Sequence, residues 1–232
     1  MSLLTLKNVS TGYGKKEVIK NISFQIENAE IVTIIGSNGA GKSTVLKTIY
    51  ALNPIWNDGE IYFNANDISS VKPEQLLKQG MVYIGQKNNT FDTLSILENL
   101  KTAGYIYSTK ELENKIKYIF EMFPKLETMQ KLKPSELSGG QKQLVALAMG
   151  LLHEPKLILF DEPSAGLDVK NMNEVFSIIQ SLKREQGISF LIVEHRVKEI
   201  EKISDRFIGL KLGELVYDAM GVDDEVLREI FL

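Results

Sequence analysis

The chain has 232 residues, 44% of them hydrophobic and 25% charged, with a formal net charge of −3 and no cysteine. This length allows one large or two small domains with a sizeable core, and the balance is that of an ordinary globular protein. The slight negative charge argues against general binding of polyanions, so we expect no nucleic-acid partner. The lack of cysteine excludes disulfides and thiolate metal sites and is compatible with a reducing compartment.

No segment has the pattern of a membrane or secretory sequence. The N-terminal MSLLTLKNVS lacks the basic head and long apolar core of a secretory signal. No uninterrupted apolar run approaches the roughly 20 residues that a membrane helix needs. If the protein works at a membrane, another chain must provide the span.

The first half of the chain begins with strand patterns. LLTLKNVS and VIKNISFQIENAE alternate apolar and polar residues, which predicts a half-exposed antiparallel sheet. We expect Asn28 to take a left-handed turn conformation before the next strand. That strand, Ile31–Ile35, is apolar and β-branched, as expected for a buried parallel strand. A helix to about Leu52 and the strands in NDGEIYF and GMVYIGQ follow.

Residues from about Lys87 to His153 have a largely helical pattern. Strand–helix alternation then resumes with KLILFDEP, a helix at Val169 to Glu185, ISFLIVE and a helix at about Arg196 to Ile203. A hairpin in RFIGLKLGELVY and a terminal helix in DDEVLREIFL complete the pattern. Alternation at both ends with a helical insert between them predicts an α/β core with a helical subdomain.

A glycine-rich segment, GSNGAGKST, directly follows the buried strand and matches the phosphate-loop pattern G-x-x-x-x-G-K-[ST]. Its glycines permit backbone angles that turn N–H groups inward around an anion, and the dipole of the following helix adds positive potential. We expect Lys42 to neutralise the β- and γ-phosphates and Ser43 to ligate magnesium. The predicted nucleotide-binding residues here are Gly36, Ser37, Asn38, Gly39, Ala40, Gly41, Lys42, Ser43 and Thr44.

Two adjacent acids, Asp161 and Glu162, follow the apolar strand in KLILFDEP. In open α/β sheets ligands bind beyond the carboxyl ends of the strands, where the phosphate loop also lies. Asp161 at that edge can hold magnesium through its water shell, and Glu162 can orient and deprotonate an attacking water. A solvated strand end is the alternative for an isolated acid pair, but the phosphate loop in the same chain favours catalysis.

The segment LSGGQ, Leu137–Gln141, places a serine and two glycines at the head of a predicted helix. A serine N-cap with freely oriented N–H groups makes a second anion-binding helix start, and a plain N-cap is the alternative. With this segment, the chain resembles the nucleotide-binding subunit of ATP-binding cassette (ABC) transporters over nearly all of its residues. The resemblance implies that the partner's nucleotide is contacted by Ser138, Gly139, Gly140 and Gln141.

The resemblance assigns roles to further residues in chain order. Tyr13 in TGYGKK resembles the aromatic residue that stacks on adenine, and Gln86 in VYIGQKNN resembles the glutamine that touches magnesium and couples to the membrane partner. Asp168 in SAGLD resembles the residue that bridges two subunits. His195 resembles the histidine that contacts the γ-phosphate and steadies Glu162, so Glu162 and His195 are the expected catalytic residues.

The family's organisation implies the fold, cofactors and partners. We expect one ABC ATPase domain over residues 1–232: a P-loop NTPase (RecA-like) core with an N-terminal antiparallel β subdomain in 1–86 and 154–232, and a helical subdomain in 87–153. ATP with Mg²⁺ would lie between the phosphate loop of one subunit and the LSGGQ segment of a second, in a homo- or heterodimer. Integral membrane permease subunits would hold the ATPase at the cytoplasmic face of the membrane.

The wording around LSGGQ and the ending VLREIFL are most similar to cassettes of branched-chain amino acid uptake systems. Three features depart from that subgroup. Met149 stands where an arginine is common, and Gln86 stands where many members carry glutamate. The segment Glu194-His195-Arg196 also differs slightly from the sequence usual in the subgroup. His153 matches no family residue, and we interpret it as structural. Import and a second, different cassette are what the subgroup implies.

Other cassette and nucleotide-binding proteins share part of this pattern. A chromosomal cassette needs a coiled-coil insertion too long for the interval from Ser43 to Ser138, and translation-type cassettes carry two copies in one chain. A small P-loop kinase has no use for LSGGQ, and a regulatory module would not need the set Lys42, Asp161, Glu162 and His195. A soluble cassette of the iron–sulfur assembly type stays open as an alternative.

Overall fold

The structure is a computed structural model that describes residues 2–87 and 89–231; Met1, Asn88 and Leu232 lie outside the described residues. Within that part of the chain the strands form two sheets. The smaller, antiparallel sheet has the order β2-β1-β4-β5, and the larger has the order β10-β9-β3-β8-β7-β6. Their bounds are β1 Leu4–Tyr13, β2 Lys16–Ile26, β3 Ile31–Ile35, β4 Glu60–Phe63, β5 Asn66–Asp67, β6 Met81–Ile84, β7 Leu157–Asp161, β8 Ser189–Val193, β9 Arg206–Lys211 and β10 Glu214–Ala219.

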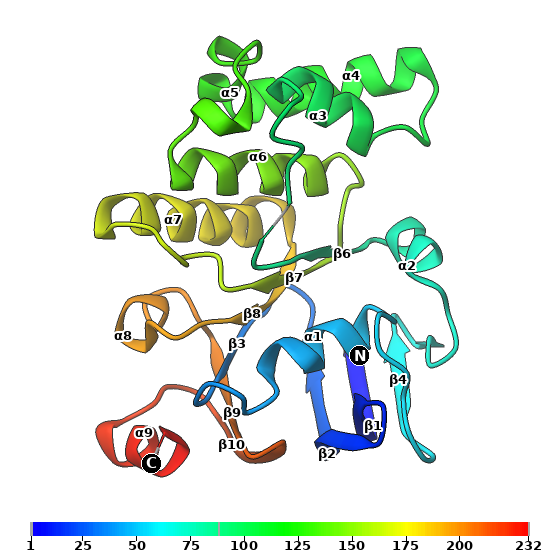
Figure 1. The fold of residues 1–232 in the computed structure, drawn as a ribbon, viewed down its shortest axis with the longest axis vertical. Helices are drawn as coiled ribbons and strands as arrows, with labels where there is room; N and C mark the ends of the chain where they lie inside the picture. The colour runs from blue at the N-terminus through cyan, green and yellow to red at the C-terminus, as the bar shows by residue number, and fades with distance from the viewer. Residues whose placement is uncertain (1, 88, 232) are drawn as a thin grey trace.

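The helices are gathered on both sides of the larger sheet. Figure 1 shows α3 to α6 at one end of the molecule, with α7 between them and the sheet, while α1 lies on the other side near β1 and β2. Their bounds are α1 Lys42–Ile49, α2 Pro73–Gln79, α3 Ile96–Ala103, α4 Thr109–Met122, α5 Pro124–Thr128, the 3₁₀ turn Pro134–Glu136, α6 Gly139–Leu151, α7 Val169–Gln186, α8 Val197–Ile200 and α9 Asp224–Phe231.

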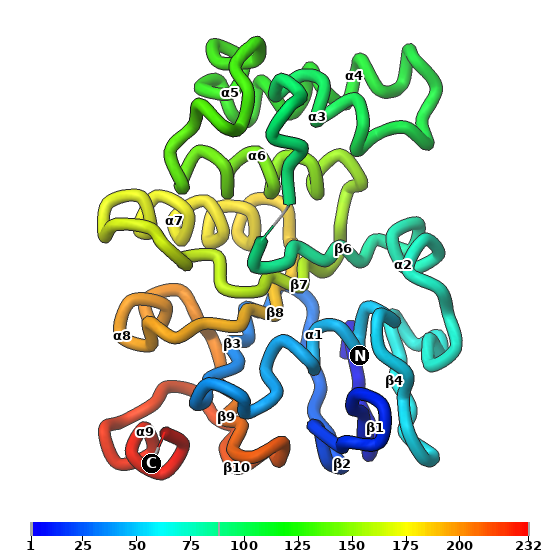
Figure 2. The backbone as a smooth tube through the Cα atoms, in the orientation of Figure 1, coloured from blue at the N-terminus to red at the C-terminus, as the bar shows by residue number. Residues whose placement is uncertain are grey.

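The helical region connects two neighbouring strands of the larger sheet. The backbone leaves β6, runs through α3, α4, α5 and α6, and returns to the neighbouring strand β7 (Figure 2). β6 and β7 pair in parallel, so this whole segment is one crossover connection of a parallel sheet. Across residues 2–87 and 89–231, none of the helices has the length and apolar character that crossing a membrane requires.

The central strands are buried on both faces. Ile31 and Ile35 of β3 belong to the apolar core shared with α3 to α7, whereas Val32 and Ile34 belong to the core shared with α1 and the smaller sheet. β7 divides its residues in the same way, and every residue of both strands is buried. Continuous apolar runs form here because successive side chains point to opposite faces and both faces are covered.

Several predicted boundaries need correction. The left-handed turn before β3 falls at Ala29, with φ of 54°, and not at Asn28. The turn places its positive φ at its second residue, although the Cβ of alanine carries a steric cost of about 1–2 kcal/mol in this region. The helix expected to reach Leu52 ends at Ile49, and the helix expected at Arg196 to Ile203 spans only Val197–Ile200. α2 and β5 were not predicted.

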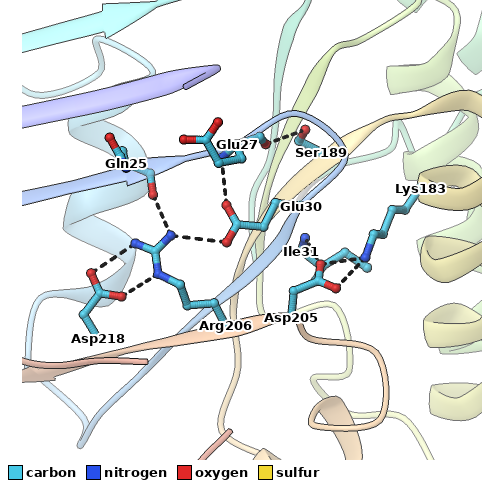
Figure 3. A network of polar contacts seen from close by, with 9 residues as sticks. All are labelled: Gln25, Glu27, Glu30, Ile31, Lys183, Ser189, Asp205, Arg206 and Asp218. Atoms are coloured by element: carbon cyan, nitrogen blue, oxygen red, sulfur yellow. Dashed lines mark hydrogen bonds and ion pairs between the residues drawn. The ribbon is translucent and has the colours of Figure 1, made fainter. Parts of the chain in front are cut away.

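A polar network joins the two sheets at the edge where β3 and β9 begin (Figure 3). The Arg206 guanidinium donates to the carbonyl oxygen of Gln25 at 3.0 Å, to Glu30 Oε1 at 3.2 Å and to both carboxylate oxygens of Asp218. Gln25 lies in β2, Arg206 in β9 and Asp218 in β10. The network therefore fixes the smaller sheet against the larger one at the edge opposite the strand carboxyl ends.

Candidate nucleotide site

The predicted site residues meet because four parallel strands end at one edge of the sheet. In the order β3-β8-β7-β6, each strand pairs in parallel with its neighbour. β3 leads into the phosphate loop, β7 ends in Asp161, β8 leads to His195, and β6 leads to Gln86. The order of the strands therefore brings together segments that are more than 100 residues apart in the sequence.

The phosphate loop needs glycine at two positions for packing as well as for backbone angles. Gly36 has φ of 154°, and a Cβ there would lie 2.3 Å from the carbonyl oxygen of Leu210. Gly41 has φ of 102°, and its Cβ would lie 2.4 Å from Ile19 Cδ1. α1 starts after Gly41 with no side-chain cap and no acid in its first turn. Its first N–H groups are thus presented to a ligand rather than to a side chain.

Lys42 folds back over the loop that precedes it. Its ammonium donates to the carbonyl oxygens of Gly36 at 2.8 Å and Ser37 at 3.1 Å, and the side chain is buried. Burial lowers the pKa of Lys42, while the negative charges of Glu162 and Asp161 oppose that shift. A buried cation whose close partners are neutral carbonyls is suited to an anionic ligand.

Asp161 is 3% exposed and receives two hydroxyl donors from different elements. Ser43 Oγ in α1 donates to Oδ1 at 2.9 Å, and Tyr83 Oη in β6 donates to Oδ2 at 3.4 Å. Burial raises the pKa of Asp161, and these two hydrogen bonds act in the opposite direction. Sequence reasoning missed Tyr83, although a tyrosine in a predicted strand two residues before the loop at Gly85 was a visible signal.

Glu162 lies between the two other predicted polar residues of this edge. His195 Nε2 is 3.0 Å from Glu162 Oε1, and Gln86 Nε2 donates to Glu162 Oε2. The Glu162 backbone has φ of 53°, a left-handed angle that is uncommon for glutamate. These contacts hold the carboxylate at the strand end beside Asp161.

Glu194 is a second glutamate at this edge of the sheet that the sequence analysis did not predict as a site residue. Glu194 follows β8, is 2% exposed, and accepts hydrogen bonds from the backbone N–H groups of Ser164, His195 and Arg196 at 2.9, 2.8 and 3.2 Å. It therefore orients the segment that carries His195 and joins it to the turn after Glu162. An acid directly after a buried strand was the available signal, as it was for Asp161.

Tyr13 lies at the end of β1 beside the start of α1. Its hydroxyl is 3.5 Å from Thr44 Oγ1 and accepts a hydrogen bond from Asn53 Nδ2 at 3.2 Å. The side chain is 50% exposed, so much of it is accessible from solvent. The structure thus brings the predicted adenine-stacking residue to the phosphate loop.

The LSGGQ segment does not reach the phosphate loop within one chain. Figure 1 shows the starts of α6 and α1 well separated, with α7 and the larger sheet between the two helices. Ser138 caps α6: its Oγ accepts from Gln141 N at 3.3 Å, and Gln141 Oε1 accepts from Ser138 N at 2.8 Å. Gly139 and Gly140 pack closely against Leu167 and Asn171 near the start of α7.

Asp168, His153 and Met149 also lie apart from the phosphate loop. Asp168 caps α7 and accepts from Asn171 N at 2.9 Å and from Asn171 Nδ2 at 2.7 Å. His153 follows α6, where its Nδ1 lies 3.2 Å from the hydroxyl of Tyr107. Met149 is partly buried against the core of the helical region. Nothing in the structure explains why Met149 stands where an arginine is common.

Comparison with known proteins decides the family. The sequence profile of the ABC transporter family matches residues 19–165. The chain belongs to the ABC transporter family. It is an ATP-binding subunit and an ATPase whose hydrolysis is coupled to transport, as the resemblance implied, and the predicted P-loop NTPase fold is confirmed.

Named relatives match this ABC transporter chain over almost its full length. It is 31% identical to the high-affinity branched-chain amino acid transport ATP-binding protein BraG of Pseudomonas aeruginosa, over 94% of this chain and 93% of that protein. It is also 31% identical to the probable branched-chain amino acid transport ATP-binding protein LivF of Archaeoglobus fulgidus, over 97% and 94%.

A solved structure similar to this ABC transporter chain is a dimer. It is the post-hydrolysis state of the ATP-binding cassette MJ0796 bound to ADP and phosphate. The TM-score is 0.80 at 29% identity, and the match covers 94% of this chain and 98% of that one. ABC transporter ATP-binding subunits therefore occur as nucleotide-bound dimers among the close structural neighbours of this chain.

Proposed function

We propose that this chain binds Mg·ATP at its phosphate loop and hydrolyses it with Glu162 as general base. One observation carries the proposal: Lys42, Ser43, Asp161, Glu162 and His195 converge at one edge of the sheet, from three separate strand ends. Each is the residue type that its step requires, namely a cation for phosphate, oxygen ligands for the metal and a carboxylate for the water.

The oxygen atoms at Ser43 and Asp161 suit magnesium. Oγ and Oδ1 lie 2.9 Å apart at the mouth of the phosphate loop, and both are hard oxygen donors. Within the described residues, no group of three or more His, Cys, Asp or Glu side chains is arranged to hold a metal. Mg²⁺ is usually held by one or two protein oxygens with waters and substrate phosphates, so this sparse donor set fits it. When bound, Mg²⁺ would neutralise charge on the phosphates.

The remaining residues bind and orient ATP. The N–H groups at the start of α1 and the Lys42 ammonium would exchange their present surroundings for phosphate oxygens. Tyr13 would stack on the adenine with its exposed ring. Glu162 would accept the proton of the attacking water while His195 holds the carboxylate in place, and Gln86 would leave Glu162 to face the metal.

We propose that the complete site needs two chains. The start of α6 and the phosphate loop of the same chain lie apart, so Ser138, Gly139, Gly140 and Gln141 would contact ATP held by a partner cassette. The partner's phosphate loop would receive the anion-binding start of α6. Asp168, at the start of α7, would contact the partner subunit. The dimeric state of the MJ0796 structure supports this arrangement.

We propose that the cassette acts at the cytoplasmic face of the membrane, bound to integral membrane permease subunits, and powers import of branched-chain or other hydrophobic amino acids. The names of BraG and LivF and the wording around LSGGQ support this substrate class. We further propose that residues 87–153 form the helical subdomain that moves against the core, residues 1–86 and 154–232.

Replacing Glu162 with glutamine tests the proposed function. Glu162→Gln keeps the shape of the side chain but removes the base, so hydrolysis should fall by about 10²–10⁴-fold. The variant should retain ATP and accumulate as a dimer that sizing with light scattering detects. Glu154→Gln makes the same change at an exposed residue and should leave both properties unchanged. Full turnover in Glu162→Gln would remove Glu162 from the role of base.

A further inference from the structure

We propose that Tyr83 is a positioning residue that holds the Asp161 carboxylate in the orientation required for the metal of the nucleotide site. The inference rests on the proposed function, because it assigns the metal to Ser43 and Asp161. The contact behind it does not depend on that function: the Tyr83 hydroxyl donates to Asp161 Oδ2 at 3.4 Å. Tyr83 does not itself reach the phosphate loop by any hydrogen bond among the described residues.

The sheet register explains why Tyr83 reaches Asp161. Tyr83 in β6 is the register partner of Leu159 in β7. Leu159 and Asp161 are two residues apart, so their side chains point to the same face of the sheet. A tyrosine opposite Leu159 can therefore extend along that face to the carboxylate at the strand end. α1 covers this face and supplies Ser43 from the opposite direction.

The Tyr83 ring is held in place by its surroundings. It packs against the Tyr50 ring, with centroids 5.7 Å apart and planes at 31°. A fixed ring with a hydroxyl at its end is a directed donor to one oxygen of Asp161.

The two carboxylate oxygens of Asp161 have different hydrogen-bond partners. Oδ1 faces Ser43, the other proposed metal ligand, and Oδ2 faces Tyr83. A serine hydroxyl that ligates a cation uses an oxygen lone pair and keeps its O–H, so Ser43 can still donate to Oδ1. Among the described residues, Tyr83 is the side-chain donor to the other oxygen, Oδ2. Groups that orient a metal ligand in this way typically alter metal affinity by about 10–100-fold.

Tyr83→Phe tests the inference, because it removes the hydroxyl and keeps the ring. Mn²⁺ binding in the presence of ADP can be followed by electron paramagnetic resonance, which needs no hydrolysis. We expect the Mn²⁺ dissociation constant to rise about 10-fold, at the low end of that range because the hydrogen bond is long. ADP affinity without metal should stay within about 2-fold of wild type, since the phosphate contacts do not involve Tyr83.

Tyr50→Phe is the matched control. It removes a hydroxyl from the ring that packs on Tyr83 and leaves both donors of Asp161 in place, so Mn²⁺ binding should not change. A merely structural role for Tyr83 would instead lower metal-free ADP affinity and thermal stability together. In an Asp161→Asn background the effect of Tyr83→Phe should shrink, since the tyrosine acts through that carboxylate.

Two results separate failure of this inference from failure of the proposed function. If the wild-type chain binds ADP but gains no Mn²⁺ site with it, the metal assignment itself is wrong. If wild type binds Mn²⁺ with ADP and Tyr83→Phe binds it equally well, the positioning role of Tyr83 is overturned while the proposed function stands.

Discussion

The polar side chains of the nucleotide site have hydrogen-bond partners within the chain. The Lys42 ammonium is bound to loop carbonyls, Ser43 to Asp161, and Glu162 to Gln86 and His195. Unpaired buried charges would be costly, so this internal pairing stabilises the site. Nucleotide binding must therefore exchange protein contacts for phosphate contacts rather than fill a set of free donors.

Lys42→Ala tests that exchange at a single residue. Removing the ammonium eliminates a charge-assisted contact to phosphate, and a bond of that kind contributes about 1.5–3 kcal/mol, or roughly 10–100-fold in affinity. Isothermal titration with ATP should show this loss. Lys110→Ala, an exposed lysine in α4, makes the same change of charge and should bind ATP as wild type does. Equal affinity in both variants would contradict the phosphate-loop assignment.

At the scale of elements, the starts of α1 and α6 differ in how their first backbone N–H groups are paired. α1 begins after Gly41 without a side-chain cap, so its first N–H groups are available to a ligand. α6 begins with a reciprocal pair between Ser138 and Gln141 that satisfies two of its donors within the chain. The Ser138 hydroxyl accepts from Gln141 N through a lone pair, so under the proposed function its O–H could still donate to the nucleotide of a partner.

The end of α6 gives the fold a pH dependence through His153. Burial, followed by the charge of Lys115, lowers the pKa of His153 below its ordinary value of 6.5. The unfolded chain then binds the proton more readily than the folded chain, so the free energy of unfolding decreases as pH falls below 6.5. For one proton the slope is at most about 1.4 kcal/mol per pH unit.

Denaturant unfolding at pH 7.5 and 5.5 measures this contribution. His153→Gln removes the titrating group but keeps a polar side chain beside Tyr107, so the variant should lose less stability than wild type on acidification. The two proteins differ only at residue 153, so the comparison isolates the contribution of His153. If both proteins lose the same free energy of unfolding on acidification, His153 has the same affinity for its proton in the folded and the unfolded chain.

At the scale of the whole molecule, the two segments predicted to contact nucleotide lie in different parts of the fold. The phosphate loop belongs to the sheet, and the start of α6 belongs to the helical region beyond α7 (Figure 1). Packed layers lie between these parts within one chain. Under the proposed function, a second copy related by symmetry would bring both parts to one nucleotide, and such dimers use the same surface twice.

The dependence of activity on concentration tests this division. We expect weak ATPase activity whose rate per chain falls on dilution, because the active species forms from two chains. Initial rates at saturating Mg·ATP over a hundredfold range of protein concentration, with the concentration verified after dilution, measure the effect. A rate per chain that stays constant down to the point where light scattering shows only monomer would rule out a shared site.

Features that depend on neighbours along the chain could be predicted from the amino-acid sequence alone. GSNGAGKST forms a phosphate-loop turn because its glycines and the start of α1 are contiguous, and apolar runs such as Ile31–Ile35 become strands buried on both faces. The order of motifs was also sufficient to recognise the family and to place Asp161, Glu162 and His195 at strand ends. The dimer and the two-part division of the chain stay predictions.

Which side chains meet depends on how the strands are arranged in three dimensions. The contacts of Gln86 with Glu162, of Tyr83 with Asp161 and of Glu194 with Ser164 depend on the strand order β3-β8-β7-β6 and its register. Hydrophobic periodicity reveals that a strand exists and which residues share a face, but not which strand lies beside it. That choice is made by packing across the whole sheet, so Tyr83 became visible as a partner of Asp161 only once β6 and β7 were placed side by side.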